Sequence, residues 1–187
     1  MACELTKGRS LDCRTEVGGV RAIYLCQYED ATLTEALGEV TDFEGVSTVY
    51  KYELKRGTAA FTEALTASSE NGTVFYEPNV NIKLHKLTKE DRQEIKLLAQ
   101  NRLIVFVELN TKLASGNNII LCLGKDNGME VSTGTAQSGA AFGDMNGYEL
   151  TFMGMESAPY LHLADYTTTP FDNTAFNGGV AITVDNN

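Results

Sequence analysis

An Asn-Gly pair at residues 71–72 separates two runs of β-type residues, and it constrains the fold more than any other feature of the sequence. Asn-Gly is the strongest short-range signal for a β-hairpin, because a type I′ turn needs a positive φ at both central residues. In the return segment, residues 73–87, apolar and polar side chains largely alternate. The apolar positions are Val74, Tyr76, Val80, Ile82 and Leu84, and the polar positions are Glu77, Asn79, Asn81, Lys83 and His85. This pattern predicts a long antiparallel hairpin with one apolar face.

The hairpin leads directly into a helix signal. Thr88 supplies an N-cap hydroxyl, and Asp91 stands three residues further on, which is the acidic variant of a capping box. Ile95, Leu98 and Ala99 follow at the i, i+3, i+4 spacing of one helical face. The pattern predicts one α-helix over Thr88–Gln100. Because its apolar stripe is narrow, we expect the helix to lie on a sheet and not inside a helix bundle.

Short β-type runs recur along the rest of the chain. They predict strands at residues 20–28, 47–55, 102–109, 119–124, 129–133, 148–154 and 180–184. In the first of these runs Tyr24 and Cys26 fall on one face, and Ile23 and Leu25 fall on the other. Residues 29–45 are acidic and interrupted by glycine, so we expect a loop with short strand pieces there. The fold class is mostly β, an antiparallel sandwich or barrel of about seven strands carrying one helix.

The domain organisation follows from composition. At 187 residues, with 43% apolar and 21% charged residues, the chain suits one globular domain with extensions. Residues 1–17 are polar and predict an N-terminal arm, residues 18–158 predict the β domain, and residues 159–187 predict a C-terminal extension.

The compartment in which the chain is made determines whether its cysteines are free thiols or disulfides. No run of 18 apolar residues is present, which predicts no membrane span, and the first ten residues lack the apolar core of a signal peptide. We therefore expect synthesis in a reducing cytoplasm, with free thiols at Cys3, Cys13, Cys26 and Cys122. The cysteine spacing contains no C-x-x-C pair, and His85 and His162 are the only histidines, so a zinc site is not predicted.

Charge is unevenly distributed along the chain. The net charge is −10, which disfavours nucleic-acid binding by phosphate neutralisation. Residues 22–50 hold six acids and no base, residues 51–102 hold nine of the fifteen bases, and eight acids but no base follow Lys125. Two interpretations stay open: a solvated acidic surface, or a self-complementary subunit whose basic middle faces an acidic patch of the next copy.

No motif in the sequence predicts catalysis. Gly124-Lys125 is not a P-loop, because Ile119 stands where the first glycine is needed and Asp126 replaces the Ser or Thr. The Gly-rich segment 134–147 does not lie between a strand and a helix, as a phosphate-binding loop requires. The sequon at residues 71–73 is better explained as the hairpin turn. We assign no catalytic, cofactor-binding or metal-binding residue and expect no enzyme activity.

The predicted return strand is unusually long. Residues 73–87 would extend about 50 Å, against about 17–20 Å for a typical strand. A strand of this length can join a sheet shared between subunits, and other copies would then cover its exposed edges.

Four segments of the chain resemble bacteriophage structural proteins. They are residues 55–63 (KRGTAAFTE), 69–78 (SENGTVFYEP), 87–98 (LTKEDRQEIKLL) and 133–152 (TGTAQSGAAFGDMNGYELTF). Their order resembles the phage tail tube family, which has antiparallel strands, one helix between two sheets and a Gly-rich Asp-x-x-Gly-Tyr hairpin. The resemblance covers about residues 18–158, and residues 159–187 depart from the compact core of that family.

The resemblance implies a structural virion protein. In a tail tube, six copies close into a ring with a continuous inner barrel, and rings stack head to tail into a DNA conduit. The acidic balance fits a lumen through which DNA passes without specific binding. The partners would be other copies and other tail or connector proteins, in the host cytoplasm during assembly and then in the virion tail. The alternatives are a capsid decoration or head–tail connector ring and, with less support, a β-barrel ligand-binding protein or enzyme.

Overall fold

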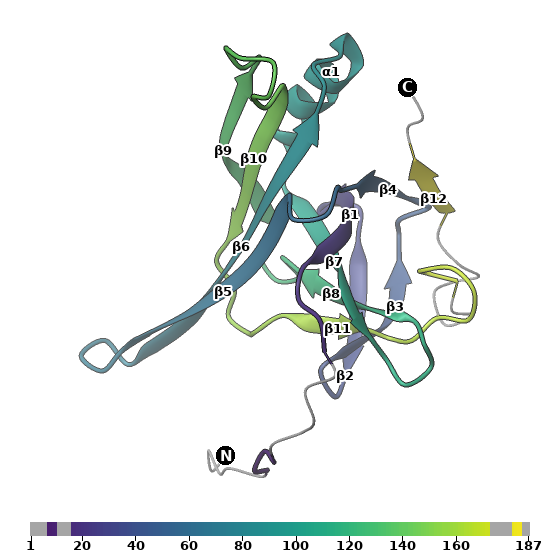
Figure 1. The fold of residues 1–187 in the computed structure, drawn as a ribbon. Coiled ribbons are helices and arrows are strands. Elements are labelled where there is room, and N and C mark those ends of the chain that lie inside the picture. The colour runs from purple at the N-terminus through teal and green to yellow at the C-terminus, as the bar shows by residue number, and fades with distance from the viewer. Residues whose placement is uncertain (1–6, 11–15, 173–180, 185–187) are drawn as a thin grey trace.

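The computed structural model describes residues 7–10, 16–172 and 181–184 (Figure 1). These residues form twelve strands joined into one mixed sheet, together with one helix, α1 (Lys89–Leu98). The strands are β1 (Val20–Gln27), β2 (Thr32–Ala36), β3 (Glu39–Glu44), β4 (Thr48–Glu53), β5 (Ala59–Ser68), β6 (Thr73–His85), β7 (Leu103–Lys112), β8 (Asn118–Leu123), β9 (Met129–Gln137), β10 (Gly147–Gly154), β11 (Leu161–Leu163) and β12 (Ala181–Val184). The mostly β class with one helix is confirmed.

The expected count of about seven strands is too low. The acidic stretch of residues 29–45, predicted as a loop with short strand pieces, contains the hairpin of β2 and β3, which turns through Leu37 (φ +55°) and Gly38 (φ +86°). β11 is only three residues long, too short for a period-two pattern to show. β11 pairs parallel to β3, and β12 pairs parallel to β4, so the sheet is mixed and not wholly antiparallel.

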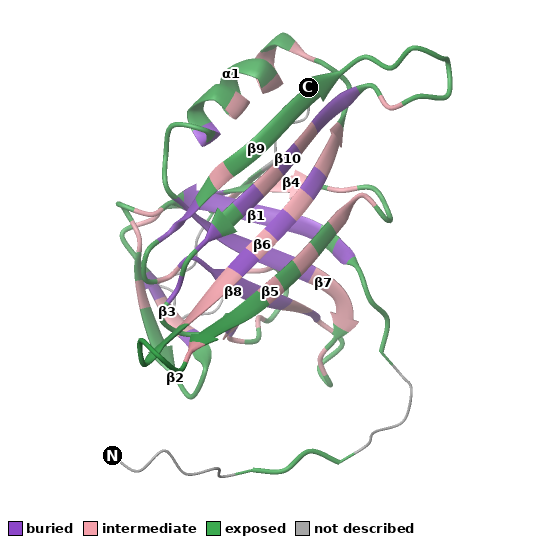
Figure 2. Cartoon of the chain, turned by 90° about the vertical axis from the view of Figure 1, so that its left-hand side faces the viewer, coloured by how far each residue is buried: buried purple, intermediate pink, exposed green. Residues whose placement is uncertain are grey.

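The sheet bends into two parts that pack face to face. β9, β10, β6 and β5 form one antiparallel part, which we call the front sheet. It joins the rest of the sheet at one pair of residues, Leu103 of β7 and Met129 of β9. In Figure 2 the front sheet lies in front of β1, β7 and β8.

The first core fills the space between the two parts. The front sheet contributes Val80, Ile82, Leu150 and Phe152, while β1, β7 and β8 contribute Ile23, Leu25, Val105, Val107, Leu121 and Leu123. Leu98 and Ile95 of α1 pack against the same cluster. The helix therefore lies on the sheet, as its narrow apolar stripe predicts.

A second core lies on the other face of β1 and β7. Tyr24 and Cys26 of β1 face this core, whereas Ile23 and Leu25 face the first one, so the predicted division of this strand is confirmed. Phe171 is fully buried here, with its ring 5.2 Å from Tyr24 and 5.0 Å from Phe106 between centroids. The segment expected as a C-terminal extension thus supplies β11 and Phe171 to this core.

The helix begins as its capping signal predicts. Thr88 is the N-cap, and its hydroxyl accepts a hydrogen bond from the backbone N–H of Asp91 at 3.0 Å. The last helical residue is Leu98, two residues before the predicted end at Gln100. Ala99 is the C-cap and is exposed.

Candidate functional site

The hairpin of β5 and β6 is the most prominent feature of the surface. Its pairing runs from Ala59 opposite Ile82 to Ser68 opposite Thr73 without interruption. Pro78 is tolerated inside β6 because the ladder from β10 stops at Asn79, so the missing N–H breaks no pairing with that strand. Figure 1 shows that the distal half of the hairpin extends well beyond the body of the molecule.

The turn differs from the predicted type I′ turn. Because Ser68 and Thr73 are the last paired residues, the loop contains four residues, 69–72, and not two. Gly72 has φ +63°, as expected, but Asn71 does not have a positive φ. A four-residue loop with glycine at the left-handed position closes the hairpin with the same sequence signal, and this explains the wrong assignment.

The outward face of the front sheet is polar. The pleat turns Asn79, Asn81 and Lys83 away from the core, opposite the inward Val80 and Ile82. Outward positions on neighbouring strands, read from the register, are Ala60, Thr62, Ala64, Thr66, Glu130, Thr133, Thr135, Glu149, Thr151 and Met153. Asn81 donates to the Thr151 hydroxyl at 3.1 Å, so the side chains also bond with one another. The front sheet therefore offers a wide face made mainly of threonine and asparagine side chains, with Glu77, Lys83, Glu130 and Glu149 as its charged groups.

Both edges of the front sheet are open. β5 pairs only with β6, and β9 from Glu130 to Gln137 pairs only with β10 in the described part of the chain. β5 carries one charge, Glu63, and neither strand contains proline or lysine. Such residues normally protect an edge strand against pairing with another chain. The protection present is limited to the inward Glu63 in β5 and to Glu130 and a bulge in β9.

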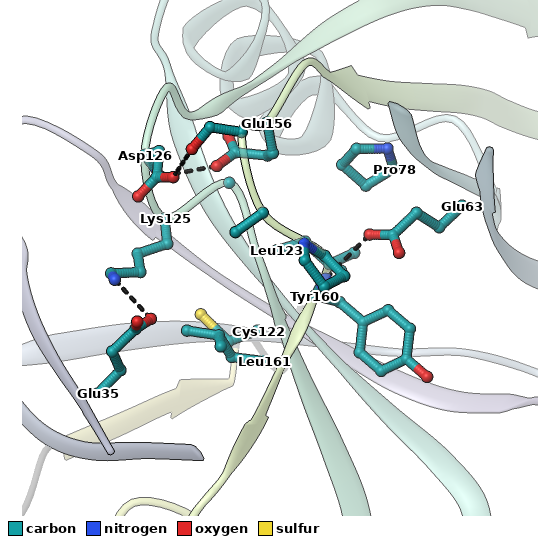
Figure 3. Close-up of a pocket in the computed structure, with 14 residues that line it drawn as sticks. Glu35, Glu63, Pro78, Cys122, Leu123, Lys125, Asp126, Glu156, Tyr160 and Leu161 are labelled. Atoms are coloured by element: carbon teal, nitrogen blue, oxygen red, sulfur yellow. Dashed lines mark hydrogen bonds and ion pairs between the residues drawn. The ribbon is translucent and has the colours of Figure 1, made fainter. Parts of the chain in front are cut away.

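A small polar cavity lies where the hairpin leaves the body (Figure 3). Its volume is about 270 Å³, just below the range of about 300–1,000 Å³ usual for ligand pockets. The Glu63 carboxylate accepts from the backbone N–H of Tyr160 at 3.0 Å. Glu156 accepts from the N–H groups of Asp126 at 2.8 Å and Asn127 at 3.1 Å, and Lys125 pairs with Glu35 at 2.5 Å. The carboxylates of the cavity hold segments of this chain together.

Burial shapes the acidity of two of these groups. It raises the pKa of Glu63 and of Glu156 above the usual 4.5, against the opposing effect of the N–H groups that each carboxylate accepts. The backbone of Glu156 also pairs with that of Tyr76, with hydrogen bonds of 2.8 and 2.9 Å. The cavity therefore fixes β6 at the point where the hairpin starts to project. This arrangement indicates a structural junction.

The residues considered for chemistry from the sequence do not form one site. His85 is exposed at the end of β6, while His162 lies in β11 beside the ring of Tyr160. Residues 134–147 form the end of β9, its loop to β10 and the first residue of β10. Cys26 and Cys122 are free and buried, whereas Cys3 and Cys13 lie outside the described residues.

Two further properties concern the same described residues. They contain no group of three or more His, Cys, Asp or Glu side chains that could hold a metal ion. None of their helices is long and apolar enough to cross a membrane.

Comparison with known proteins gave no match: no protein-family model, no curated protein and no solved structure is similar to this chain.

Proposed function

We propose that this chain is a structural virion protein, the self-assembling subunit of a phage tail tube. The observation that carries the proposal is the front sheet, a four-stranded antiparallel layer with one apolar face, one polar face and two open edges. We propose with it that the fold is a tail-tube-like sandwich. In it the front sheet is the inner layer, and the rest of the sheet with α1 lies outside.

The edges give the lateral contact. Lys83 donates its backbone N–H to the Thr58 carbonyl at 2.9 Å, so every second residue of β5 from Thr58 onwards bonds inward to β6. The residues between them, beginning with Ala59, turn their N–H and C=O groups to the open side. β9 of a neighbouring copy offers the same kind of free edge. Pairing of β5 in one copy with β9 in the next joins the two front sheets. Because the two edges in contact are different, the copies follow one another head to tail around a ring.

The joined front sheets close into a ring when the number of copies matches the curvature of the combined sheet. Six copies, the number implied by the family resemblance, would contribute four strands each, twenty-four in all. With about 4.8 Å between strands and a tilt of about 40°, the barrel would be about 50 Å across. Side chains of about 5 Å on each side would leave a channel of about 40 Å. This channel is wide enough for a DNA duplex.

The polar face suits the inside of such a channel. The acids on it are Glu77, Glu130 and Glu149, and the base on it, Lys83, is paired with Glu149 at 3.6 Å. Its other side chains are mainly threonine and asparagine, which carry no charge. A weakly negative, hydroxyl- and amide-rich lumen repels phosphate, and the charge of Lys83 is compensated by Glu149, so little positive charge is left to retain DNA.

The lateral contact can be tested at Ala59. We expect Ala59→Pro to keep the hairpin, because the N–H that proline removes faces the open edge, and to block ring formation in analytical ultracentrifugation. Ala59→Ser, which keeps the N–H, is the matched control and should assemble like the wild type. Rings formed by Ala59→Pro would contradict the β5–β9 contact. Wild-type rings that never stack would favour the second candidate, a decoration or connector ring.

A further inference from the structure

We infer that the tip of the hairpin of one copy docks on the β9–β10 loop of the next copy along the tube axis. This inference rests on the proposed function and assigns its axial contact. We call residues 64–77 the hairpin tip, and residues 86–89 together with 138–146 the loop end. The partner is a second copy of this chain.

The hairpin tip has an apolar face that is largely exposed in the described part of the subunit, with Tyr76 partly covered. Leu65 lies opposite Tyr76, and Ala67 lies opposite Val74, so the four side chains share one face. This face continues the apolar face of β6 that packs in the first core. Beyond the body, however, Leu65 is 61% exposed and Val74 is 55% exposed. The same alternation that builds the core therefore continues into solvent, which is typical of a surface that another chain buries.

The loop end presents a single aromatic side chain on an ordered loop. The Asp144 carboxylate accepts from the N–H groups of Ala140 at 2.9 Å and Ala141 at 2.8 Å, and its own N–H donates to the Ala141 carbonyl. Lys86 donates its N–H to the Asn146 carbonyl at 2.9 Å, which ties the loop to the end of β6. These bonds hold Phe142 out in solvent, fully exposed. An aromatic residue presented in this way is the usual kind of interface anchor.

The two surfaces lie at opposite ends of the molecule. Both Figure 1 and Figure 2 show the hairpin tip at one end of β6, and the β9–β10 loop and α1 at the other. In a stack whose copies all point the same way, the tip of one copy faces the loop end of the next. Phe142 would then insert against Leu65 and Val74, so that each apolar group finds a partner.

Charge supports the same pairing. The tip carries Glu70 and Glu77, and no Lys or Arg occurs between Gly57 and Ile82. At the opposite end Lys86 is exposed, and Lys55 and Arg56 are exposed in the turn that precedes β5, whose Thr58 carbonyl accepts from the N–H of Lys83. Of the acids at that end, Glu149 is paired with Lys83, and Asp144 is engaged by its own loop. The other acids there are Glu90, Asp91 and Glu94 of α1, which the bases Lys89, Arg92 and Lys96 of the same helix balance. An acidic tip and a basic loop end favour head-to-tail stacking over the reverse orientation.

The test begins with the wild type, which must form tubes for the inference to stand. In that background we expect Phe142→Ser, and separately Leu65→Ser/Val74→Ser, to form rings but to raise the protein concentration needed for stacking at least about ten-fold. Leu97→Ser on α1 is the matched control, because Leu97 is also exposed (41%) and belongs to neither surface. Normal tubes from both variants would overturn the inference and leave the proposed ring intact.

A crosslink locates the contact directly. In a chain whose Cys3 and Cys13 are replaced by serine, Leu65→Cys with Phe142→Cys should yield disulfide-linked multimers when tubes are oxidised, and none when dispersed subunits are oxidised. Glu70→Lys/Glu77→Lys should prevent stacking, and adding Lys86→Glu should restore it in part. Tubes without crosslinks, or stacking that ignores salt up to about 1 M, where the screening length is about 3 Å, would contradict the pairing.

Discussion

Removing the buried carboxylate of Glu108 should destabilise the fold by several kcal/mol. Glu108 lies in β7 and is 5% exposed. Its two oxygens accept hydrogen bonds from the Tyr24 hydroxyl at 2.7 Å and the Asn118 amide at 2.6 Å, and Arg21 lies 3.7 Å away. Glu108→Ala leaves both buried donors without an acceptor. At about 1–3 kcal/mol for each lost partner, the expected loss is about 3–5 kcal/mol.

Urea denaturation at pH 7, followed by circular dichroism, measures this loss. Glu149→Ala is the matched control, because its carboxylate is half-exposed on the front sheet, where it pairs with Lys83 and accepts from the Asn81 amide at 3.4 Å; it should cost less than about 1 kcal/mol. In a double-mutant cycle with Tyr24→Phe, we expect the two losses to be non-additive. A loss below about 1 kcal/mol for Glu108→Ala would refute the assignment of this network as a buried support of the second core.

Four more measurements test the structure of the subunit itself. Because the pKa of Glu156 is raised, the stability that its protonated carboxyl group contributes is lost as pH rises from 4.5 through the raised pKa. Glu156→Gln should remove this pH dependence from the free energy of unfolding. Backbone N–H donors lower the pKa of Asp172 from 3.8 to about 2, so the stability that its carboxylate contributes is lost as pH falls from 3.8 through about 2. Asp172→Asn should make the free energy of unfolding less dependent on pH in this range. Gly147→Ala should cost about 1–3 kcal/mol, because the added Cβ would lie 2.0 Å from a backbone oxygen of β6, whereas Gly143→Ala, with open space, should cost little. Burial raises the pKa of Cys26 to about 12, so a thiol reagent at pH 8 should modify it only as fast as the protein unfolds; faster reaction would contradict its position in the core.

The parts of the fold that could be predicted are those in which the local signal and the tertiary environment agree. Thr88 caps its helix because the hydroxyl and the N–H three residues later belong to one local motif. The division of β1 into two faces could be predicted because successive side chains of a strand point to opposite faces, whatever the rest of the fold. The apolar face of β6 could be read in the same way, although its distal half, at Val74, is exposed in the isolated subunit.

The missed parts depend on contacts between distant segments. β11 is three residues long and is held by β3 and β8, so its own sequence carries too few positions for a pattern. Phe171 is buried by rings from β1, β3 and β7, which no local signal near residue 171 indicates. The open edges of β5 and β9 could not be predicted either, because an edge is a property of strand order and not of the strand.

Electron microscopy of the purified protein at increasing concentration tests the central claim most directly. We predict rings, and above a threshold concentration tubes, of uniform width, with a central channel of about 40 Å lined by the front sheets. A species that stays strictly monomeric at high concentration would contradict it.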